Sequence, residues 1–148
     1  MYCIKSRITK SYSCEIPFIA ANMDTVTEER MAVAMGELGA VGSLHRFLSP
    51  EQQAQEVKNI IELKKNNPHL LAAASVGVKI DGMRRADLLV DAGVEILTLD
   101  IAHGDSVMML EVLDYLKKTH PHVDVIAGNV AMPDGVKRMI DAGADSIK

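Results

Sequence analysis

Four short apolar runs in this sequence each stop at side chains that can do chemistry. The runs cover residues 16–24, 41–46, 96–106 and 125–129. The polar groups and the thioether at or near their ends belong to Asn22, Met23, Asp24, His45, Arg46, Asp100, His103 and Asn129. Carboxylate, imidazole, amide and guanidinium groups can bind polar ligands and move protons once the chain brings them together. Whether these residues meet depends on the elements that carry them.

The pattern around these runs predicts buried parallel strands joined by helices. Strand and helix signals alternate along the chain, which favours a parallel sheet with crossover helices. We expect strands over residues 17–21, 41–44, 71–76, 95–100 and 124–127, with a sixth strand beginning at residue 145. In a parallel (β/α) barrel the carboxyl ends of the strands meet at one rim, where the active site lies. The chemistry-bearing side chains should therefore share that rim.

Helix signals fill the intervals between these strands. We expect helices over residues 25–38, 49–65, 83–92, 106–119 and 133–142. Two of them begin with the spacing of a capping box, Thr25 with Glu28 and Ser49 with Gln52. In the first helix, Met31 and Leu38 fall on one apolar stripe, so we expect them to face the core. Glycines at positions 39, 93 and 143 separate a helix from the next strand, as a left-handed helix cap requires.

The composition is that of an ordinary globular protein. The 148 residues are 48% hydrophobic and 24% charged, with a net charge of -4, so charge does not favour nucleic acid or an anionic membrane as a partner. No apolar run approaches the roughly 20 residues that cross a bilayer, and the first residues lack the apolar core of a signal peptide. We therefore expect a cytoplasmic protein. Cys3 and Cys14 are interpreted as ordinary thiols in a reducing compartment.

The end of the chain bears on the fold class. The sixth strand has room for only about three residues, which makes a poor sheet edge, and a barrel needs eight strands to close. A doubly wound open sheet of five or six strands is the alternative. We expect an α/β fold, namely an incomplete parallel (β/α) TIM barrel with about five βα units plus the start of strand six. Residues 1–148 would then form one partial barrel of a catalytic domain.

Three longer motifs carry a family resemblance. Residues 16–28 (IPFIAANMDTVTE), 99–104 (LDIAHG) and 126–130 (IAGNV) resemble, in this order, the IMP dehydrogenase and GMP reductase family. Residues 43–46 (SLHR) and 142–148 (AGADSIK) extend the resemblance over nearly all of the chain. It implies a (β/α)8 barrel, commonly a homo-tetramer, that does NAD(P)-dependent redox chemistry at C2 of a purine nucleotide. The dehydrogenase passes hydride from IMP to NAD, and the reductase uses NADPH to deaminate GMP to IMP.

The resemblance also implies roles for single residues. Asn22 and Met23 would bind the substrate, with the thioether against the purine base, which is a favourable contact. Asp100 would contact the nicotinamide ribose, since a carboxylate accepts hydroxyl hydrogen bonds. Asn129 would lie close to the reacting centre. The other cofactor-binding residues would be Ile101, Ala102, His103 and Arg46, the last standing where reductases often carry a lysine.

The catalytic cysteine of the family has no counterpart in this sequence. In the family it follows strand six, in a glycine-rich loop that also helps hold a monovalent cation, K+. Neither Cys3 nor Cys14 matches that position. Covalent attack at C2 needs a positioned thiolate. We therefore expect an oxidoreductase by family resemblance, but no turnover by this chain alone. By the same resemblance, the chain also lacks the loops after the later strands that hold the phosphate of the nucleotide. It lacks as well the flap whose arginine activates water in the dehydrogenase.

The motifs leave the two activities of the family open. Dehydrogenases usually carry a regulatory domain inserted after strand two, and residues 45–71 have no room for it. The lack of room for that domain favours the reductase, and so do residues 75–79 (SVGVK). Residues 6–10 (SRITK), running into residues 24–28, look more like the dehydrogenase. NAD and NADP therefore both stay open as the cofactor.

Two hypotheses from other classes compete with this one. In the first, the half-barrel is itself the mature product, a non-catalytic scaffold or relic that pairs with a copy of itself, because exposed strand edges invite pairing. In the second, His45, Asp100 and His103 hold the metal ion of a lyase, although no two of them have helical ligand spacing. The positions of these side chains in space test the second hypothesis.

Overall fold

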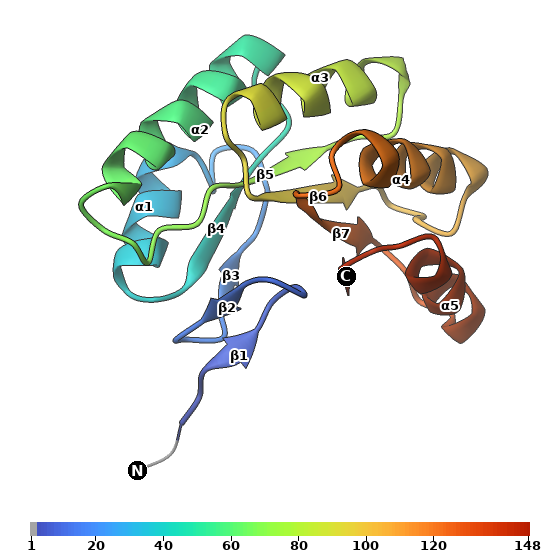
Figure 1. Cartoon of the computed structure of the whole chain (residues 1–148), viewed down its shortest axis with the longest axis horizontal. Coiled ribbons are helices and arrows are strands. Elements are labelled where there is room, and N and C mark those ends of the chain that lie inside the picture. The colour runs from blue at the N-terminus through green and yellow to red at the C-terminus, as the bar shows by residue number, and fades with distance from the viewer. Residues whose placement is uncertain (1–2) are drawn as a thin grey trace.

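Six parallel strands form the frame of the structure. They are β3 (Ile19–Ala20), β4 (Val41–Leu44), β5 (Ala73–Val76), β6 (Ile96–Asp100), β7 (Asp124–Gly128) and β8 (Ser146–Ile147). Each strand pairs in parallel with the next one along the chain, so their order in the sheet is their order in the sequence. The computed structural model, which describes residues 3–148, confirms the predicted α/β class: the sheet curls into an incomplete barrel (Figure 1).

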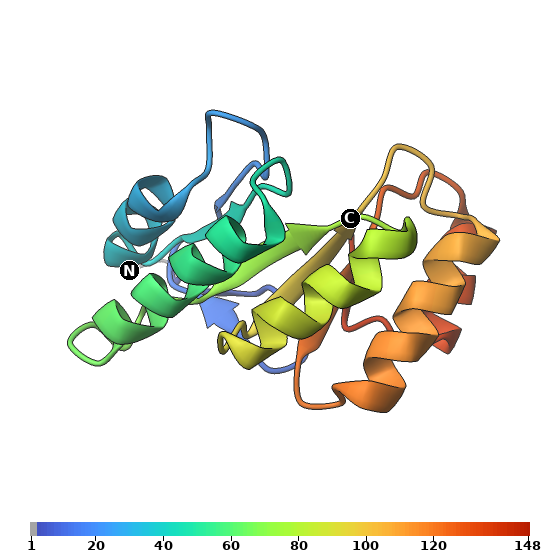
Figure 2. The same cartoon turned by 90° about the horizontal axis from the view of Figure 1, so that it is seen from above.

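Five helices cover the outer face of the curled sheet. They are α1 (Glu29–Glu37), α2 (Pro50–Lys64), α3 (Ile80–Asp91), α4 (Val107–Thr119) and α5 (Pro133–Asp141). Figure 2 shows α2, α3 and α4 side by side over the strands. Each helix returns the chain to the start of the next parallel strand, as a crossover connection must. Within the described part of the chain, no helix is long and apolar enough to span a membrane.

The four central strands, β4 to β7, are buried on both faces, and alternate residues serve the two faces. Leu97 and Leu99 of β6 belong to the large core beneath the helices, and both are fully buried. Ile96 and Thr98 of the same strand point to the inside of the curl, where Thr98 lines the inner cavity. This alternation follows from the period of two along a strand. It places Asp100, two residues after Thr98, on the inner side of the rim.

A short hairpin closes the amino end of the barrel interior, which the sequence patterns did not predict. Its antiparallel strands are β1 (Ser6–Arg7) and β2 (Ser13–Cys14). Ile8 and Cys14 pack against residues at the starts of the barrel strands, including Val41 and Ile96. The Asp124 carboxylate accepts hydrogen bonds from the Ser11 backbone N–H at 2.8 Å and from the Ser11 hydroxyl at 3.1 Å. These contacts attach the hairpin to the barrel floor.

The helix starts confirm one predicted capping box and contradict the other. At α2, the Ser49 hydroxyl accepts the Gln52 N–H, and the Gln52 side chain accepts the Ser49 N–H. At α1, Thr25 has a positive φ of 57° and lies before the helix, so the Thr25–Glu28 capping box is wrong. The Glu29 N–H instead donates to the Glu56 carboxylate of α2 at 3.1 Å. The cap of α1 is thus a tertiary contact.

The buried face of α1 also differs from the predicted one. Ala32 and Gly36 face the core, whereas Met31 is 42% exposed and Leu38 is 68% exposed. A Cβ placed on Gly42 of β4 would lie only 2.6 Å from Ala32 Cα. The helix and strand backbones are therefore so close that small residues must fill the contact, and the large apolar residues turn outward.

The predicted glycine caps are confirmed at all three places. Gly39, Gly93 and Gly143 have φ values of 82°, 94° and 98°, and each follows a helix by one turn residue. This conformation is strained for residues that carry a Cβ. At these three places the cap turns the chain from the end of a helix toward the next strand.

Candidate functional site

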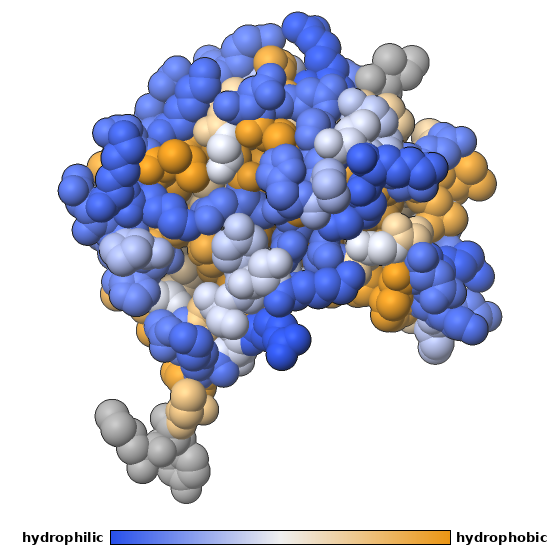
Figure 3. Space-filling view, viewed as in Figure 1, coloured by the Kyte–Doolittle hydropathy of each residue, from blue (hydrophilic) through white to orange (hydrophobic). Residues whose placement is uncertain are grey.

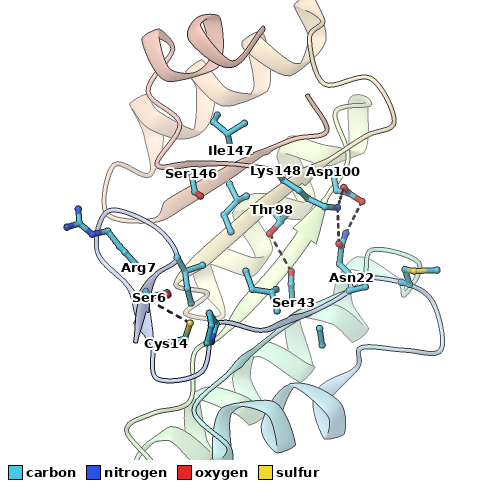
Figure 4. A pocket seen from close by; sticks show the side chains of 17 residues that line it. Ser6, Arg7, Cys14, Asn22, Ser43, Thr98, Asp100, Ser146, Ile147 and Lys148 are labelled. Atoms are coloured by element: carbon cyan, nitrogen blue, oxygen red, sulfur yellow. Dashed lines mark hydrogen bonds and ion pairs between the residues drawn. The ribbon is translucent and has the colours of Figure 1, made fainter. Parts of the chain in front are cut away.

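Three polar side chains from three strands meet at the carboxyl end of the barrel. Asn22 follows β3, Asp100 ends β6 and Lys148 follows β8 (Figure 4). The Asp100 carboxylate accepts the Asn22 amide at 2.8 Å on one oxygen and the Lys148 ammonium at 2.6 Å on the other. Lys148 Nζ also donates to Asn22 Oδ1 at 3.3 Å. This Asn22–Asp100–Lys148 cluster holds the carboxylate in one orientation.

Two members of the cluster were predicted site residues, and Lys148 was missed. Asn22 and Asp100 lie 78 residues apart in the sequence, and the structure brings them into contact. Lys148 belongs to the motif at residues 142–148, but a lysine that follows a strand has no distinguishing local signal. Its position at the end of the sixth strand, on the same rim as the other two, is the signal that could have identified it.

A cavity of about 570 Å³ lies beside this cluster on the inner side of the sheet. Asn22, Asp100 and Lys148 line it together with Met23, whose side chain is 59% exposed. Its wall includes Ser43 and Thr98, whose hydroxyls lie 3.5 Å apart. The volume falls within the range of small-molecule sites, which combine apolar walls with a few placed polar groups.

A second cavity, of about 290 Å³, lies at the same end of the barrel and contains two predicted cofactor-binding residues. Its lining includes Arg46 after β4, Ile101 after β6 and the segment between β5 and α3. A Cβ on Gly77 would lie 3.4 Å from Arg46 Nη1, so the guanidinium rests directly over this glycine. Arg46 Cζ also lies 5.2 Å from the centre of the Phe47 ring. The two cavities have no lining residue in common, but β6 leads from one to the other, because Asp100 lines the first and Ile101 lines the second.

The other predicted residues, Ala102 and His103 after β6 and Asn129 after β7, lie on adjoining loops but line neither cavity. The Asn129 N–H donates to the Ile101 carbonyl at 2.8 Å, and the Gly104 N–H donates to the Asn129 carbonyl at 2.8 Å. The side chains of Ala102, His103 and Asn129 are exposed. Backbone bonds therefore hold Asn129 against the loop at residues 101–104, while its amide remains accessible to a ligand.

His45 is buried and belongs to a different group of side chains from the one predicted for a lyase. Its Nε2 lies 3.3 Å from Glu28 Oε1 and 3.8 Å from Asp24 Oδ1. Among residues 3–148 this is the one group of His, Cys, Asp and Glu side chains that is close enough to hold a metal ion, so the trio His45, Asp100 and His103 is wrong. His45 Nδ1 accepts the Phe47 N–H at 3.1 Å, which leaves the proton on Nε2. A protonated Nε2 donates a hydrogen bond to the Glu28 carboxylate and offers no lone pair to a metal.

The two cysteines lie away from the rim. Cys14 is buried in the hairpin at the amino end, where its sulfur lies 3.6 Å from the Ser6 carbonyl oxygen. Cys3 is exposed and precedes the hairpin. Neither thiol is therefore placed beside the Asn22–Asp100–Lys148 cluster.

Comparison with known families covers almost the whole chain. The model of the IMP dehydrogenase / GMP reductase domain matches residues 2–148. This chain belongs to that family. It is 34% identical to the inosine-5'-monophosphate dehydrogenase of Cryptosporidium parvum, over 98% of this chain and 45% of that protein. It is 36% identical to the GMP reductase of Oenococcus oeni, over 90% of this chain and 40% of that protein.

A further dehydrogenase shows the same partial overlap. The chain is 30% identical to the inosine-5'-monophosphate dehydrogenase of Borreliella burgdorferi, over 98% of this chain and 47% of that protein. The chain thus spans somewhat less than half the length of these relatives. Similarity to both kinds of enzyme agrees with the motifs, which do not separate the two activities.

Proposed function

We propose that this chain supplies the base-binding and cofactor-binding part of a purine-nucleotide oxidoreductase that acts at C2 of IMP or GMP. The observation that carries the proposal is the Asn22–Asp100–Lys148 cluster, which fixes a carboxylate at the barrel rim beside a cavity of about 570 Å³. Residues 1–148 would belong to one catalytic barrel without an inserted regulatory domain, since α2 and its two short connections fill the stretch between β4 and β5.

The side chains suit the parts of such ligands. A carboxylate has about four lone-pair sites, so Asp100 can accept ribose hydroxyls while it remains bonded to Asn22 and Lys148. Met23 presents an exposed thioether at the cavity edge, which suits contact with a purine face. Asn129 can donate and accept through its exposed amide. NAD or NADP, when bound, supplies the hydride chemistry, and these residues bind and orient it.

Turnover requires a group that the described rim does not contain. Nucleophilic attack at C2 needs a thiolate within reach of the base. Cys14 is buried at the opposite end of the barrel, and Cys3 precedes the hairpin. We therefore expect the 148-residue chain to bind ligands without turning them over. In the parent enzyme, the thiolate, the K+ site and the tetramer would come from other segments or other copies.

Binding of the reduced cofactor tests the proposal directly. The fluorescence of NADH and NADPH is titrated with the 148-residue chain and with Asp100→Asn. Loss of one charge-assisted contact should weaken binding about tenfold or more, because such a hydrogen bond contributes roughly 1.5–3 kcal/mol. Asp114→Asn is the matched control, since Asp114 pairs with Lys118 on the exposed face of α4. Equal affinities for both variants would show that Asp100 does not bind the cofactor.

One observation favours self-association as a second candidate function. The outer strands of the sheet are β3 and β8, and apolar side chains are exposed near both. Phe18 beside β3 is 67% exposed, and Ile140 of α5 is 56% exposed. Figure 3 shows apolar surface on the side of the molecule where α5 lies. Sedimentation velocity over a range of concentrations tests this candidate, and a monomer at every concentration would contradict it.

A further inference from the structure

The connection from β3 to α1, residues 21–28, places Asn22 and Met23 at the rim on a backbone with one unusual residue. Both side chains line the cavity of about 570 Å³, and Asn22 bonds Asp100. In the same connection, Thr25 has a φ of 57°, and it is the one non-glycine residue with a positive φ in the described part of the chain. A β-branched residue is rarely found at positive φ, because its Cβ crowds the backbone. Such a conformation persists only where surrounding contacts impose it, so other residues must hold this loop in place.

Thr27 makes such contacts from a fully buried position. Its side chain is 0% exposed. Its hydroxyl donates to the Ala21 carbonyl at 2.6 Å, and its N–H donates to the Met23 carbonyl at 3.2 Å. The carbonyl of Thr27 accepts the N–H of His45, which directly follows β4, at 3.2 Å. Asn22 therefore lies between two carbonyl groups that one residue binds, and that residue is joined to the end of the neighbouring strand.

The side chain of His45 attaches the same loop at a second point. The residue is 1% exposed, and its Nε2 donates to the carboxylate of Glu28 at 3.3 Å. Its Nδ1 accepts the Phe47 N–H at 3.1 Å, so the ring is held on both sides. The loop is thus tied to the end of β4 through Thr27 and Glu28, and neither of these two residues lines the inner cavity.

We propose that Thr27 is the positioning residue for Asn22 and Met23. It lines neither cavity at the rim, so it acts on a ligand through those two side chains. Removal of its hydroxyl leaves the Ala21 carbonyl without this donor, and the strain at Thr25 then favours a different loop conformation. The inference rests on the proposed function only for the identity of the ligand, because the positions of the two side chains do not depend on it.

Carbon-13 NMR of methyl-labelled methionine reads the position of Met23 without any ligand. The Met23 signal is assigned with Met23→Leu. Thr27→Val nearly keeps the size of the side chain and removes the hydroxyl, so the Met23 signal should shift, while the signals of the fully buried Met109 and Met139 should stay. Thr27→Ser keeps the hydroxyl and should restore the original signal. An unchanged Met23 signal in Thr27→Val, or an equal shift in Thr27→Ser, would overturn the proposal.

Titration of NADH adds a readout that a purely structural role would not move. Because Asn22 bonds Asp100, Thr27→Val should weaken NADH binding about threefold, and Thr27→Ser should leave it unchanged. Thr9→Val is the matched control, since Thr9 is 2% exposed and its hydroxyl oxygen accepts the Tyr12 N–H at the opposite end of the barrel. Both valine variants should lower the urea midpoint, but only Thr27→Val should change the affinity.

Amide hydrogen exchange of the unchanged chain tests the same loop even if Thr27→Val does not fold. The N–H groups of Val26 and Thr27 both donate to the Met23 carbonyl, at 3.1 and 3.2 Å. We expect both to exchange about a hundredfold or more slowly than in an unstructured peptide. Exchange at the rate of an unstructured peptide would contradict a loop that Thr27 fixes.

The Met23 signal separates this inference from the proposed function. If Asp100→Asn leaves NADH binding unchanged while Thr27→Val shifts the Met23 signal, the oxidoreductase assignment fails and Thr27 still positions the loop. If Asp100→Asn weakens NADH binding while Thr27→Val changes neither the Met23 signal nor the affinity, the positioning role is wrong and the proposed function stands.

Discussion

Gln53 joins the ends of two barrel strands to the buried Arg85, and its replacement should be costly. The residue is fully buried on α2. Its Nε2 donates to the His45 carbonyl at 3.1 Å and to the Ser75 carbonyl at 2.8 Å, while its Oε1 accepts Arg85 Nη1 at 2.9 Å. Gln53→Met keeps the length of the side chain and removes all three hydrogen bonds.

The expected loss follows from the three bonds. Each of the two neutral bonds contributes about 0.5–1.5 kcal/mol, and the bond to the charged guanidinium contributes about 1.5–3 kcal/mol. We therefore expect Gln53→Met to lower the free energy of unfolding by about 4 kcal/mol, a large part of the roughly 5–15 kcal/mol typical of a domain. Gln55→Met is the control, because Gln55 is exposed on the same helix and its side chain donates to Asn59. Its expected cost is below about 0.5 kcal/mol.

Urea unfolding followed by circular dichroism measures both variants by linear extrapolation. A difference below about 1 kcal/mol between Gln53→Met and Gln55→Met would refute the reasoning, because it would mean that water replaces the lost partners at no cost. A double-mutant cycle with Arg85→Met then isolates the Gln53–Arg85 contact. We expect the double variant to lose about 1–2 kcal/mol less than the sum of the single losses.

Three further substitutions test a buried carboxylate, a helix cap and a core side chain as contributions to the stability of the fold. Burial acts to raise the pKa of Asp145, but hydrogen bonds from Lys117 and the Val125 N–H outweigh it, so the pKa lies below its usual value. The carboxylate therefore stabilises the fold above about pH 4 and loses this effect as the pH falls through the folded pKa. Urea unfolding at pH 7 and pH 3 should show a smaller pH dependence for Asp145→Asn. Ser49→Ala should cost about 1 kcal/mol in the same assay, because it removes the α2 capping box. Leu113→Ala empties a fully buried position and should cost about 2–5 kcal/mol in urea unfolding.

The sequence predicted the barrel strands because their pattern is local and strong. The apolar runs, the glycine caps and the Ser49 capping box each depend on residues within a few positions of one another. The buried face of α4 is local in the same way, because Met109, Leu113 and Leu116 have helical spacing and all three are buried. These predictions hold because the folded structure satisfies the same local preferences that produce the sequence patterns.

The failures share a different physical origin, which is contact between distant segments. The cap of α1 comes from Glu56, whose carboxylate accepts the N–H of Glu29, 27 residues earlier in the chain. The face of α1 is decided by its close approach to Gly42 rather than by the sizes of its own side chains. Arg85 and Lys148 carry no local signal either, because their neighbours in the site come from other strands and helices. Sequence periodicity cannot report distances between elements.

The charged side chains at the two ends of the barrel differ in their access to a ligand. At the amino end, Asp124 and Asp145 are buried and bonded to Ser11, Lys117 and other donors, so their charges are satisfied within the chain. At the carboxyl end, Asp100 is paired with Lys148 and also lines the cavity of about 570 Å³, where a ligand can reach it. A charge that is buried and bonded within the chain contributes to stability, whereas a charge that lines a cavity can also bind a ligand. Substitutions at the amino end should therefore change the free energy of unfolding without changing ligand affinity, and Asp100→Asn at the carboxyl end should reduce the affinity for the reduced cofactor.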